Sequence, residues 1–322
     1  MLTVIGETLI DEVIRPGQDP VPHVGGSPMN VAVGLARLGH PVQFLGRYGS
    51  DAYGVMVASH LHGNDVLVPV APDALPTSVA RAMIGDDGAA EYEFDLAWEL
   101  PAIAPDASGT PNFMLAATTL LHTGSIATML SPGADQVFSA VLAAHPSTTI
   151  TYDPNCRPSI ITDVDYARAQ AEKFVRLADV VKASDEDLQW LYPGVDPKES
   201  ARRWLGINGA AAGPAVVVVT QGGDGPWAVC AAGEAACPVP ATAVVDTVGA
   251  GDSFMAALLG ALVDRELDGA QRRVELRGIN VPALAELIRY AAAAAAVTVS
   301  RAGANPPSRA ELQESMKISQ GR

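Results

Sequence analysis

A short segment near residue 250 combines acidic and small residues in front of an apolar stretch. It reads Asp246-Thr-Val-Gly-Ala-Gly-Asp-Ser-Phe254. The small residues at 249–251 allow a tight turn whose N–H groups point outward at the start of a helix, where the helix dipole favours an anion such as phosphate. Asp252 would then accept a proton from an attacking hydroxyl group. The two aspartates and the following helix favour this chemistry over an ordinary loop in which Asp252 only complements the helix dipole.

Two further segments carry groups that suit a polar ligand. Gly25-Gly26-Ser-Pro-Met-Asn30 pairs glycines, which allow close backbone approach, with an amide that both donates and accepts hydrogen bonds. Helix capping explains Asn30 equally well. Asp153, Asn155 and Arg157 follow a predicted strand, where ligands bind in open α/β sheets. A proline-rich turn without a ligand is the alternative there.

A fourth segment, Val216 to Gly225, is an apolar strand that ends in a glycine-rich loop without lysine. Such a loop permits a nucleotide to approach the backbone, and it is also compatible with a hairpin into Trp227 to Val229. No lysine follows a glycine, and no Gly-x-Gly-x-x-Gly follows the first strand. P-loop and Rossmann dinucleotide sites are therefore disfavoured.

The elements that must position these groups alternate between strands and helices. We predict strands over 2–5, 42–45, 149–152, 180–182 and 216–220, and helices over 30–38, 251–263, 282–299 and, at the end of the chain, 306–322. This order predicts a mostly parallel sheet covered on both faces. Residues 78–84 and 90–94 flank Gly85-Asp-Asp-Gly88 and predict a hairpin, either an edge decoration or a flap over a site.

Composition limits the classes of partner. The 322 residues carry a formal charge of −15, which argues against sequence-independent binding to nucleic acid or to an anionic membrane. The start of the chain does not look like a signal peptide, and we expect no membrane span and no disulfide framework from three cysteines. A cytoplasmic protein is the expectation.

With these four segments in this order, the chain resembles the PfkB (ribokinase-like) family of carbohydrate kinases over nearly its whole length. The two family signatures correspond to GGSPMNVAVGLARLG, residues 25–39, and DTVGAGDSF, residues 246–254. GETLID near the start, LHTGS at 121–125 and DPNCRPS at 153–159 are most like the fructokinase branch. The resemblance implies a single ribokinase-like domain over 1–322, a three-layer α/β sandwich with a mostly parallel central sheet and a small β-sheet lid.

The resemblance also implies roles for individual residues. Asp252 would be the catalytic base, and Gly249, Ala250 and Gly251 would form the anion hole for the transferred phosphoryl group. The sugar would be bound by Asp11, Gly26, Asn30, Asn155 and Arg157. The nucleotide would be bound by Lys182, Thr220, Gly222 and Gly225, together with Gly249 and Gly251.

The implied cofactors are ATP and Mg²⁺, with K⁺ as a further cation. Mg²⁺ would be held mostly through water and phosphate oxygens, and Asp246 with the backbone near Gly303 would neighbour the monovalent cation. The family's Asn-x-x-Glu motif corresponds to Ser184-Asp-Glu-Asp187, so that either Asp187 or Glu186 supplies its carboxylate. An asparagine near the adenine in relatives corresponds to Ala292. The loss of this asparagine weakens the expectation that ATP is the only phosphoryl donor.

In relatives a lid closes over the sugar, and here it would be built from about 11–26 and 77–98. Tyr92, Phe94 and Trp98 would supply its apolar face, and an exposed lid edge would pair with a second subunit to give a homodimer. The implied activity is transfer of the γ-phosphoryl group of ATP to a primary hydroxyl group of a ketohexose, and fructose is the expected one. The alternatives are 2-keto-3-deoxygluconate, another sugar or a nucleoside as acceptor, and a sugar-binding regulator without catalysis.

Overall fold

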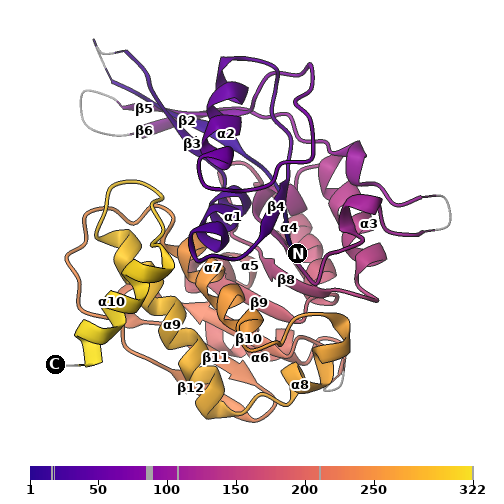
Figure 1. Ribbon diagram of the computed structural model, residues 1–322, viewed down its shortest axis with the longest axis vertical. Helices are drawn as coiled ribbons and strands as arrows, with labels where there is room; N and C mark the ends of the chain where they lie inside the picture. The colour runs from indigo at the N-terminus through magenta and orange to yellow at the C-terminus, as the bar shows by residue number, and fades with distance from the viewer. Residues whose placement is uncertain (16, 18, 85–89, 107–108, 210–211, 321–322) are drawn as a thin grey trace.

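The central sheet of the protein has eight strands in the order β12-β11-β10-β9-β8-β7-β1-β4 (Figure 1). The computed structural model describes residues 1–15, 17, 19–84, 90–106, 109–209 and 212–320. The strands are β1 (Leu2–Ile5), β4 (Val42–Leu45), β7 (Leu120–Gly124), β8 (Thr149–Asp153), β9 (Val180–Ser184), β10 (Val216–Thr220), β11 (Trp227–Cys230) and β12 (Gly233–Ala236). The strands from β4 to β10 pair in parallel, whereas β11 and β12 are antiparallel. The prediction of a mostly parallel sheet is therefore confirmed.

Helices cover both faces of this sheet because its strands are apolar on both sides. In β10, Val216 and Val218 belong to one buried core, and Val217 and Val219 belong to the other. The first core includes residues of α1 (Ser27–Arg37), α2 (Ala52–His62), α7 (Ala250–Val263), α8 (Arg273–Arg277), α9 (Val281–Val299) and α10 (Arg309–Gln320). The second includes residues of α3 (Gly133–Ala144), α4 (Val164–Val175), α5 (Asp185–Leu191) and α6 (Pro197–Leu205). This is the predicted three-layer arrangement.

A second, four-stranded sheet lies at one end of the central sheet, above α1 in Figure 1. Its order is β3-β2-β5-β6, built from β2 (Leu9–Ile14), β3 (Val21–Gly25), β5 (Val79–Ile84) and β6 (Ala90–Asp95). This is the predicted lid sheet, and its edges are β3 and β6. The turn expected at 85–88 lies outside the described residues, and the homodimer through the lid stays a prediction.

Trp98 is not part of the lid, contrary to the expectation from the sequence. It follows β6, is only 6% exposed, and its indole N–H donates to the carbonyl oxygen of Ala127 at 3.0 Å. Tyr92 and Phe94 do share one face of β6, where their rings stack with centroids 6.2 Å apart. The tryptophan is buried in the core beside α3 because its large ring is more stable there than on an exposed sheet.

Three of the predicted helices begin one to three residues late, and the last begins three residues early. Helix α1 begins at Ser27 rather than Asn30, because Gly26 is its N-cap and Pro28 fits its first turn. Helices α7, α9 and α10 begin at 250, 281 and 309, against the expected 251, 282 and 306. Short 3₁₀ segments lie at Pro101–Ile103, Phe113–Leu115, Ser125–Thr128, Gly222–Asp224 and Ala270–Arg272.

Helix α9 is long and apolar enough to cross a membrane by length and composition alone. Half of the apolar window is buried inside the protein, and Leu284, Leu287 and Ile288 are completely buried in the core that α9 shares with α7. These are the properties of the core helix of a globular protein, since its apolar side chains already contact protein rather than an external solvent.

Truncation of this core should cost stability without touching the chemistry. We expect Leu287→Ala, at a side chain with no exposed surface, to lower the free energy of unfolding by about 2–5 kcal/mol, because it removes buried methyl groups and leaves a cavity. Urea denaturation measures this. Val274→Ala, at a side chain that is 80% exposed, is the matched control and should change stability by less than about 0.5 kcal/mol. Equal effects of the two would contradict the described packing.

Candidate active site

The N-terminus of α7 is the centre of the site. Gly249 is its N-cap and has φ of 74°, in the left-handed region that favours glycine. A Cβ atom at this position would also lie 2.6 Å from the Cβ of Ala304, so that any larger residue would collide. The left-handed turn starts the helix at Ala250 and leaves the first N–H groups of the helix without partners inside it. Such a helix end is suited to an anion.

Asp252 lies in the first turn of α7 and is held by two side chains of α1. Ser27 Oγ donates to Asp252 Oδ1 at 2.7 Å, and Asn30 Nδ2 donates to Asp252 Oδ2 at 2.8 Å. The carboxylate is buried, with 8% of the residue exposed. Asn30 therefore orients Asp252 rather than capping α1, which resolves the alternative that the sequence leaves open. Each carboxylate oxygen keeps a lone pair for a further donor.

Two cavities meet at this helix end. The smaller, of about 380 Å³, is lined by Glu7, Leu9, Asp11, Gly26, Ser27, Asn30, Ser125, Ile126, Ile160, Val248, Gly249 and Asp252. The larger, of about 850 Å³, is lined by residues that include Lys182, Ser184, Asp185, Glu186, Asp187, Thr220, Gly222, Gly225, Phe254 and Ala292. Both are lined by Asn155, Arg157, Thr247, Ala250 and Gly251. The site is therefore two compartments joined beside α7.

The smaller cavity is rich in carboxyl groups. Glu7 and Asp11 line it together with Asp252, against the one guanidinium group of Arg157. Burial raises the pKa of Asp11 above its ordinary value, although Arg157 and His23 act in the opposite direction. This density of acceptors suits a ligand with many hydroxyl donors.

Glu7 is a member of this cavity that the analysis of the sequence did not single out. It follows β1, is 5% exposed, and accepts a hydrogen bond at Oε2 from the N–H of Ala127 at 3.1 Å. Burial raises its pKa from 4.5 to about 7, and a hydrogen bond with Ser125 and the charge of Arg157 only partly offset this. The glutamate stands within GETLID, two residues after a predicted strand, and that position is the signal that could have identified it.

The paired glycines of the first signature let the chain pass close to these carboxyl groups. A Cβ atom on Gly25 would lie 2.2 Å from Oδ2 of Asp11. Gly26 has φ of 119°, and a Cβ atom there would lie 2.6 Å from the carbonyl oxygen of Glu7. Any larger residue at position 26 would therefore collide with the backbone. Gly26 allows the start of α1 to lie beside the smaller cavity.

Asn155 and Arg157 stand where the two cavities join. Asn155 is in the left-handed region with φ of 36°, and its N–H donates to Asp153 Oδ1 at 3.2 Å. Arg157 is exposed, and its Nη1 donates to the side-chain oxygen of Asn155 at 2.6 Å and to the carbonyl oxygens of Asn155 and Cys156, both at 3.0 Å. The loop therefore holds one nitrogen of the guanidinium group in place.

Lys182 places a buried positive charge beside the start of α7. Its Nζ lies 2.8 Å from Asp153 Oδ2 and would lie 3.3 Å from a Cβ atom built on Gly251. Burial lowers the pKa of Lys182, but the nearby carboxylates, chiefly Asp153, more than offset this, and its pKa is raised. Burial raises the pKa of Asp153 to about 6, with Lys182 acting in the opposite direction. The lysine stays charged at neutral pH.

Both oxygens of Asp187 are already engaged. Oδ1 accepts from the N–H of Cys156 at 2.7 Å, and Oδ2 accepts from the N–H of Ser184 at 2.8 Å in a capping box at the start of α5. Glu186 is exposed and lines the larger cavity, as Asp185 does. Asp187 thus ties the end of β9 to the 155–157 loop, while Glu186 presents a carboxylate toward the cavity.

The loop after β10 lines the larger cavity and also leads into a hairpin, so that the two interpretations of Val216 to Gly225 are both correct. Thr220 ends β10, which pairs antiparallel with β11. Gly222 and Gly225 have φ of 46° and 85°. A Cβ atom on Gly225 would lie 2.3 Å from the carbonyl oxygen of Cys237, so that the chain passes through a space that only glycine fits.

The far wall of the larger cavity is made of small apolar side chains. Ala292, Ala295, Ala296 and Val299 of α9 line it. A planar base placed there would contact methyl groups rather than a side-chain amide.

Asp246 joins the second signature to the segment after α9. Its Oδ1 accepts from the N–H of Val248 at 3.0 Å, and its Oδ2 accepts from the N–H of Gly303 at 2.8 Å. These backbone hydrogen bonds lower the pKa of Asp246, so that it stays ionised. The predicted proximity of Asp246 and Gly303 is therefore present. Within the described ranges, no three His, Cys, Asp or Glu side chains are grouped so that they could hold a metal ion by themselves.

The chain is similar to known carbohydrate kinases in sequence and in fold. Residues 1–311 match the model of the pfkB family carbohydrate kinases. A fructokinase from Rhizobium leguminosarum bv. trifolii is 30% identical over 276 residues, which cover 81% of this chain and 79% of that relative. A fructokinase from Xylella fastidiosa with bound ATP superposes with a TM-score of 0.84 at 24% identity, covering 100% and 99% of the two chains. A double mutant of fructokinase from Vibrio cholerae O395, bound to fructose, ADP and potassium ion, has a TM-score of 0.76 at 25% identity and 97% coverage of both chains.

The raised pKa of Glu7 predicts how stability depends on pH. Because the folded state holds this proton more tightly than the unfolded chain does, stability is lost as pH rises from 4.5 through about 7. Glu7→Gln stays neutral and should gain about 2 kcal/mol over the wild type between pH 5 and pH 8, measured by urea denaturation. Exposed Glu314→Gln is the control and should show no such gain. The same difference between Glu7→Gln and the wild type at both pH values would contradict the burial of this carboxyl group.

Proposed function

This chain belongs to the pfkB family of carbohydrate kinases, which are phosphotransferases, and we propose that it transfers the γ-phosphoryl group of ATP to a primary hydroxyl group of fructose. The observation that carries the proposal is the meeting of the two cavities at α7. Asp252 lines the smaller one, and Lys182 lines the larger one. An acceptor and a donor held on these two sides would face each other across the first turn of the helix.

The residues present define the steps of the transfer. The acceptor lies in the smaller cavity with a hydroxyl group against Asp252, whose orientation Ser27 and Asn30 fix. As the hydroxyl oxygen forms its bond to the γ-phosphorus atom, the proton passes to the Asp252 carboxylate. The bond from phosphorus to the bridging oxygen breaks, and ADP leaves from the larger cavity.

The charge that develops on the transferred group is stabilised from two directions. Ala250 and Gly251 at the start of α7 line both cavities. The N–H group of Ala250 donates to the carbonyl oxygen of Thr247 at 3.3 Å, so that the N–H group of Gly251, with the helix dipole behind it, is the one offered to the transferred group. The buried ammonium group of Lys182 lies beside Gly251. The loop with Thr220, Gly222 and Gly225 supports the rest of the nucleotide.

The residues of the larger cavity fit Mg²⁺ carried by ATP rather than a metal held by protein alone. Glu186 and Asp185 supply carboxylates, and Asp187 is occupied by backbone N–H groups, so that water and phosphate oxygens must complete the coordination. When bound, Mg²⁺ neutralises phosphate charge. The ionised Asp246 beside the backbone of Gly303 fits a neighbouring K⁺ in the same way.

The charges of the smaller cavity favour a neutral sugar as acceptor. Asp11 and Asp252, together with Glu7 once it is ionised, would repel a carboxylate on the acceptor, and Arg157 already uses one nitrogen on its own loop. Fructose is neutral and rich in hydroxyl donors, and the relatives described above are fructokinases. Arg157 is the observation in favour of the second candidate, 2-keto-3-deoxygluconate, because a guanidinium group can bind a carboxylate.

Asp252→Asn tests the assignment of the base. We expect kcat to fall by about 10²–10⁴-fold, because the amide cannot accept the proton, whereas binding of the sugar is largely kept. A coupled ADP-release assay gives the rate, and calorimetric titration with the sugar gives the affinity. Asp264→Asn is the matched control, since it removes a carboxylate just after the other end of the same helix, and it should keep full activity. Wild-type turnover by Asp252→Asn would reject the role.

The acceptor is tested by the same assay with fructose, ribose, 2-keto-3-deoxygluconate and adenosine in parallel. We expect kcat/KM for fructose to exceed that for the sugar acid by at least about tenfold, because the carboxylates of Asp11 and Asp252 line the smaller cavity. Preference for the sugar acid, lost in Arg157→Gln, would establish the second candidate instead. Preference for ribose or adenosine would contradict both.

A further inference from the structure

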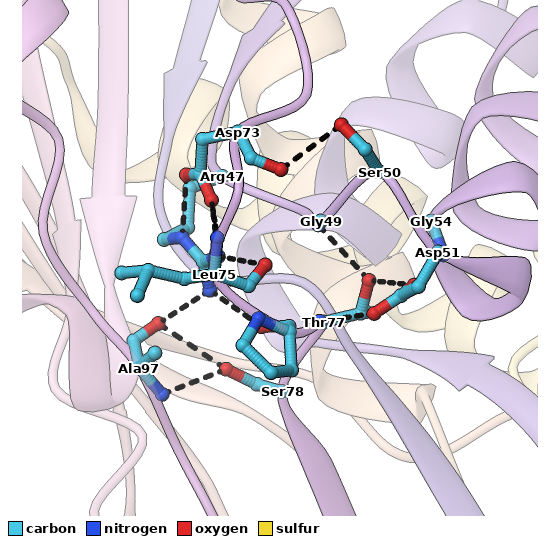
Figure 2. Close-up of polar contacts among 11 residues, drawn as sticks. Arg47, Gly49, Ser50, Asp51, Gly54, Asp73, Leu75, Thr77, Ser78 and Ala97 are labelled. Atoms are coloured by element: carbon cyan, nitrogen blue, oxygen red, sulfur yellow. Dashed lines mark hydrogen bonds and ion pairs between the residues drawn. The ribbon is translucent and has the colours of Figure 1, made fainter.

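Arg47 is a buried arginine outside the two cavities, and each of its five N–H groups has an acceptor (Figure 2). Nε and Nη2 donate to the two carboxylate oxygens of Asp73 at 2.8 and 2.6 Å. Nη2 also donates to the carbonyl oxygen of Leu75 at 2.7 Å, and Nη1 donates to those of Pro76 and Ala97 at 3.0 and 3.2 Å. Only 3% of the residue is exposed.

These acceptors lie on the two chain segments that connect the lid hairpin to the rest of the protein. Residues 73–78 lead into β5, and Ala97 follows β6. Ser78 Oγ joins the two connections, since it donates to the carbonyl oxygen of Ala97 at 3.2 Å and accepts from its N–H at 3.1 Å. We call residues 73–78 and 97 the lid root.

The lid root is attached to the body of the protein through a second carboxylate as well. Asp51, which caps α2, accepts from the N–H of Thr77 at 2.8 Å and from its hydroxyl group at 2.7 Å (Figure 2). The N–H of Gly49 donates to Thr77 Oγ1 at 3.0 Å. Arg47 and Asp51 both follow β4, a strand of the central sheet, and so they hold the lid root against that sheet.

Two short paths connect the lid root to the smaller cavity. In the first, the carbonyl oxygen of Ser78 accepts from the N–H of Ile10 at 2.9 Å, next to Asp11 on β2. In the second, the indole N–H of Trp98, adjacent to Ala97, donates to the carbonyl oxygen of Ala127. The N–H of Ala127 in turn donates to Glu7. Asp11 and Glu7, whose carboxyl groups line the cavity together with Asp252, are therefore connected to the lid root through one and two hydrogen bonds, respectively.

We propose that Arg47 is a positioning residue for the acceptor site, which fixes the lid root and thereby holds Asp11 and Glu7 against the sugar without contacting it. The inference rests on the proposed function for the identity of the acceptor. Only a planar guanidinium group can form a bidentate hydrogen bond to a carboxylate and donate to three carbonyl oxygens at the same time. Lysine therefore cannot replace Arg47. The hydrogen bonds from Arg47 are also the main cause that lowers the pKa of Asp73, and the N–H group of Leu75 acts in the same direction.

Arg47→Lys tests this role by separating the two substrates. A looser lid root lowers the fraction of protein whose acceptor site is assembled, and the apparent affinity for the acceptor falls by that fraction. We expect KM for the sugar to rise by at least about tenfold, while KM for ATP and kcat at saturating sugar stay within about twofold. Ser78→Ala, which cuts the cross-link to Ala97 but leaves Arg47 intact, should shift the same constant in the same direction.

Arg273→Lys is the matched control. Arg273 is a half-buried arginine, and it binds Asp179 at 2.8 Å and the carbonyl oxygens of His145 and Thr148, both at 2.6 Å. It lies at the opposite end of the central strands, where β8 begins. Its loss should lower stability in the same way as the loss of Arg47 but leave KM for the sugar unchanged.

The outcomes separate the inference from the proposed function. Equal changes of KM for the sugar in Arg47→Lys and Arg273→Lys, or a fall of kcat alone in Arg47→Lys, would overturn the positioning role, because each is the effect of general destabilisation. Amide hydrogen exchange over Leu9–Ile14 and Val79–Ile84 needs no substrate, and it should speed up in Arg47→Lys but not in Arg273→Lys. If the wild type phosphorylates none of the sugars, the proposed function fails while the exchange measurement still decides the role of Arg47.

Discussion

The site depends on one turn of backbone, the left-handed Gly249 that starts α7. This turn starts α7 beside both cavities, and it places Asp252 three residues further on, buried between Ser27 and Asn30. An anion-binding helix end and a proton acceptor thus lie within four residues of one another. In the proposed function, the rest of the site brings a sugar to one side of this turn and a nucleotide to the other.

The buried charges around the turn are interdependent. Lys182 is stable as an ammonium ion inside the protein because Asp153 is in contact with it and because Asp187 and Asp252 lie near. Asp153 also accepts from the backbone of Asn155, so that the same carboxylate organises the loop that both cavities share. The loss of one member would leave another charge buried without its partner, which is more costly than the loss of a surface ion pair.

The sequence predicted the features that are encoded within a few neighbouring residues, and it did not predict those that depend on contacts between distant parts of the chain. The Asp246–Phe254 segment, the parallel sheet and the lid hairpin were predicted because glycine turns, apolar runs and helix starts lie within a few residues of one another. The contact between Asn30 and Asp252 joins residues 222 positions apart, and capping was an equally good explanation until the fold brought them together. Trp98 was misplaced because an aromatic residue near a strand does not indicate which core will bury it. Glu7 was missed because its carboxyl group acts through burial, which depends on the fold.

The most direct test is a crystal structure of the protein with fructose and a non-hydrolysable ATP analogue. The account predicts that a primary hydroxyl group of the sugar lies about 3 Å from the Asp252 carboxylate, within hydrogen-bond reach. It also predicts that the terminal phosphate meets the N–H group of Gly251 between the two cavities. A sugar bound with every hydroxyl group away from Asp252, or a terminal phosphate away from the start of α7, would contradict it.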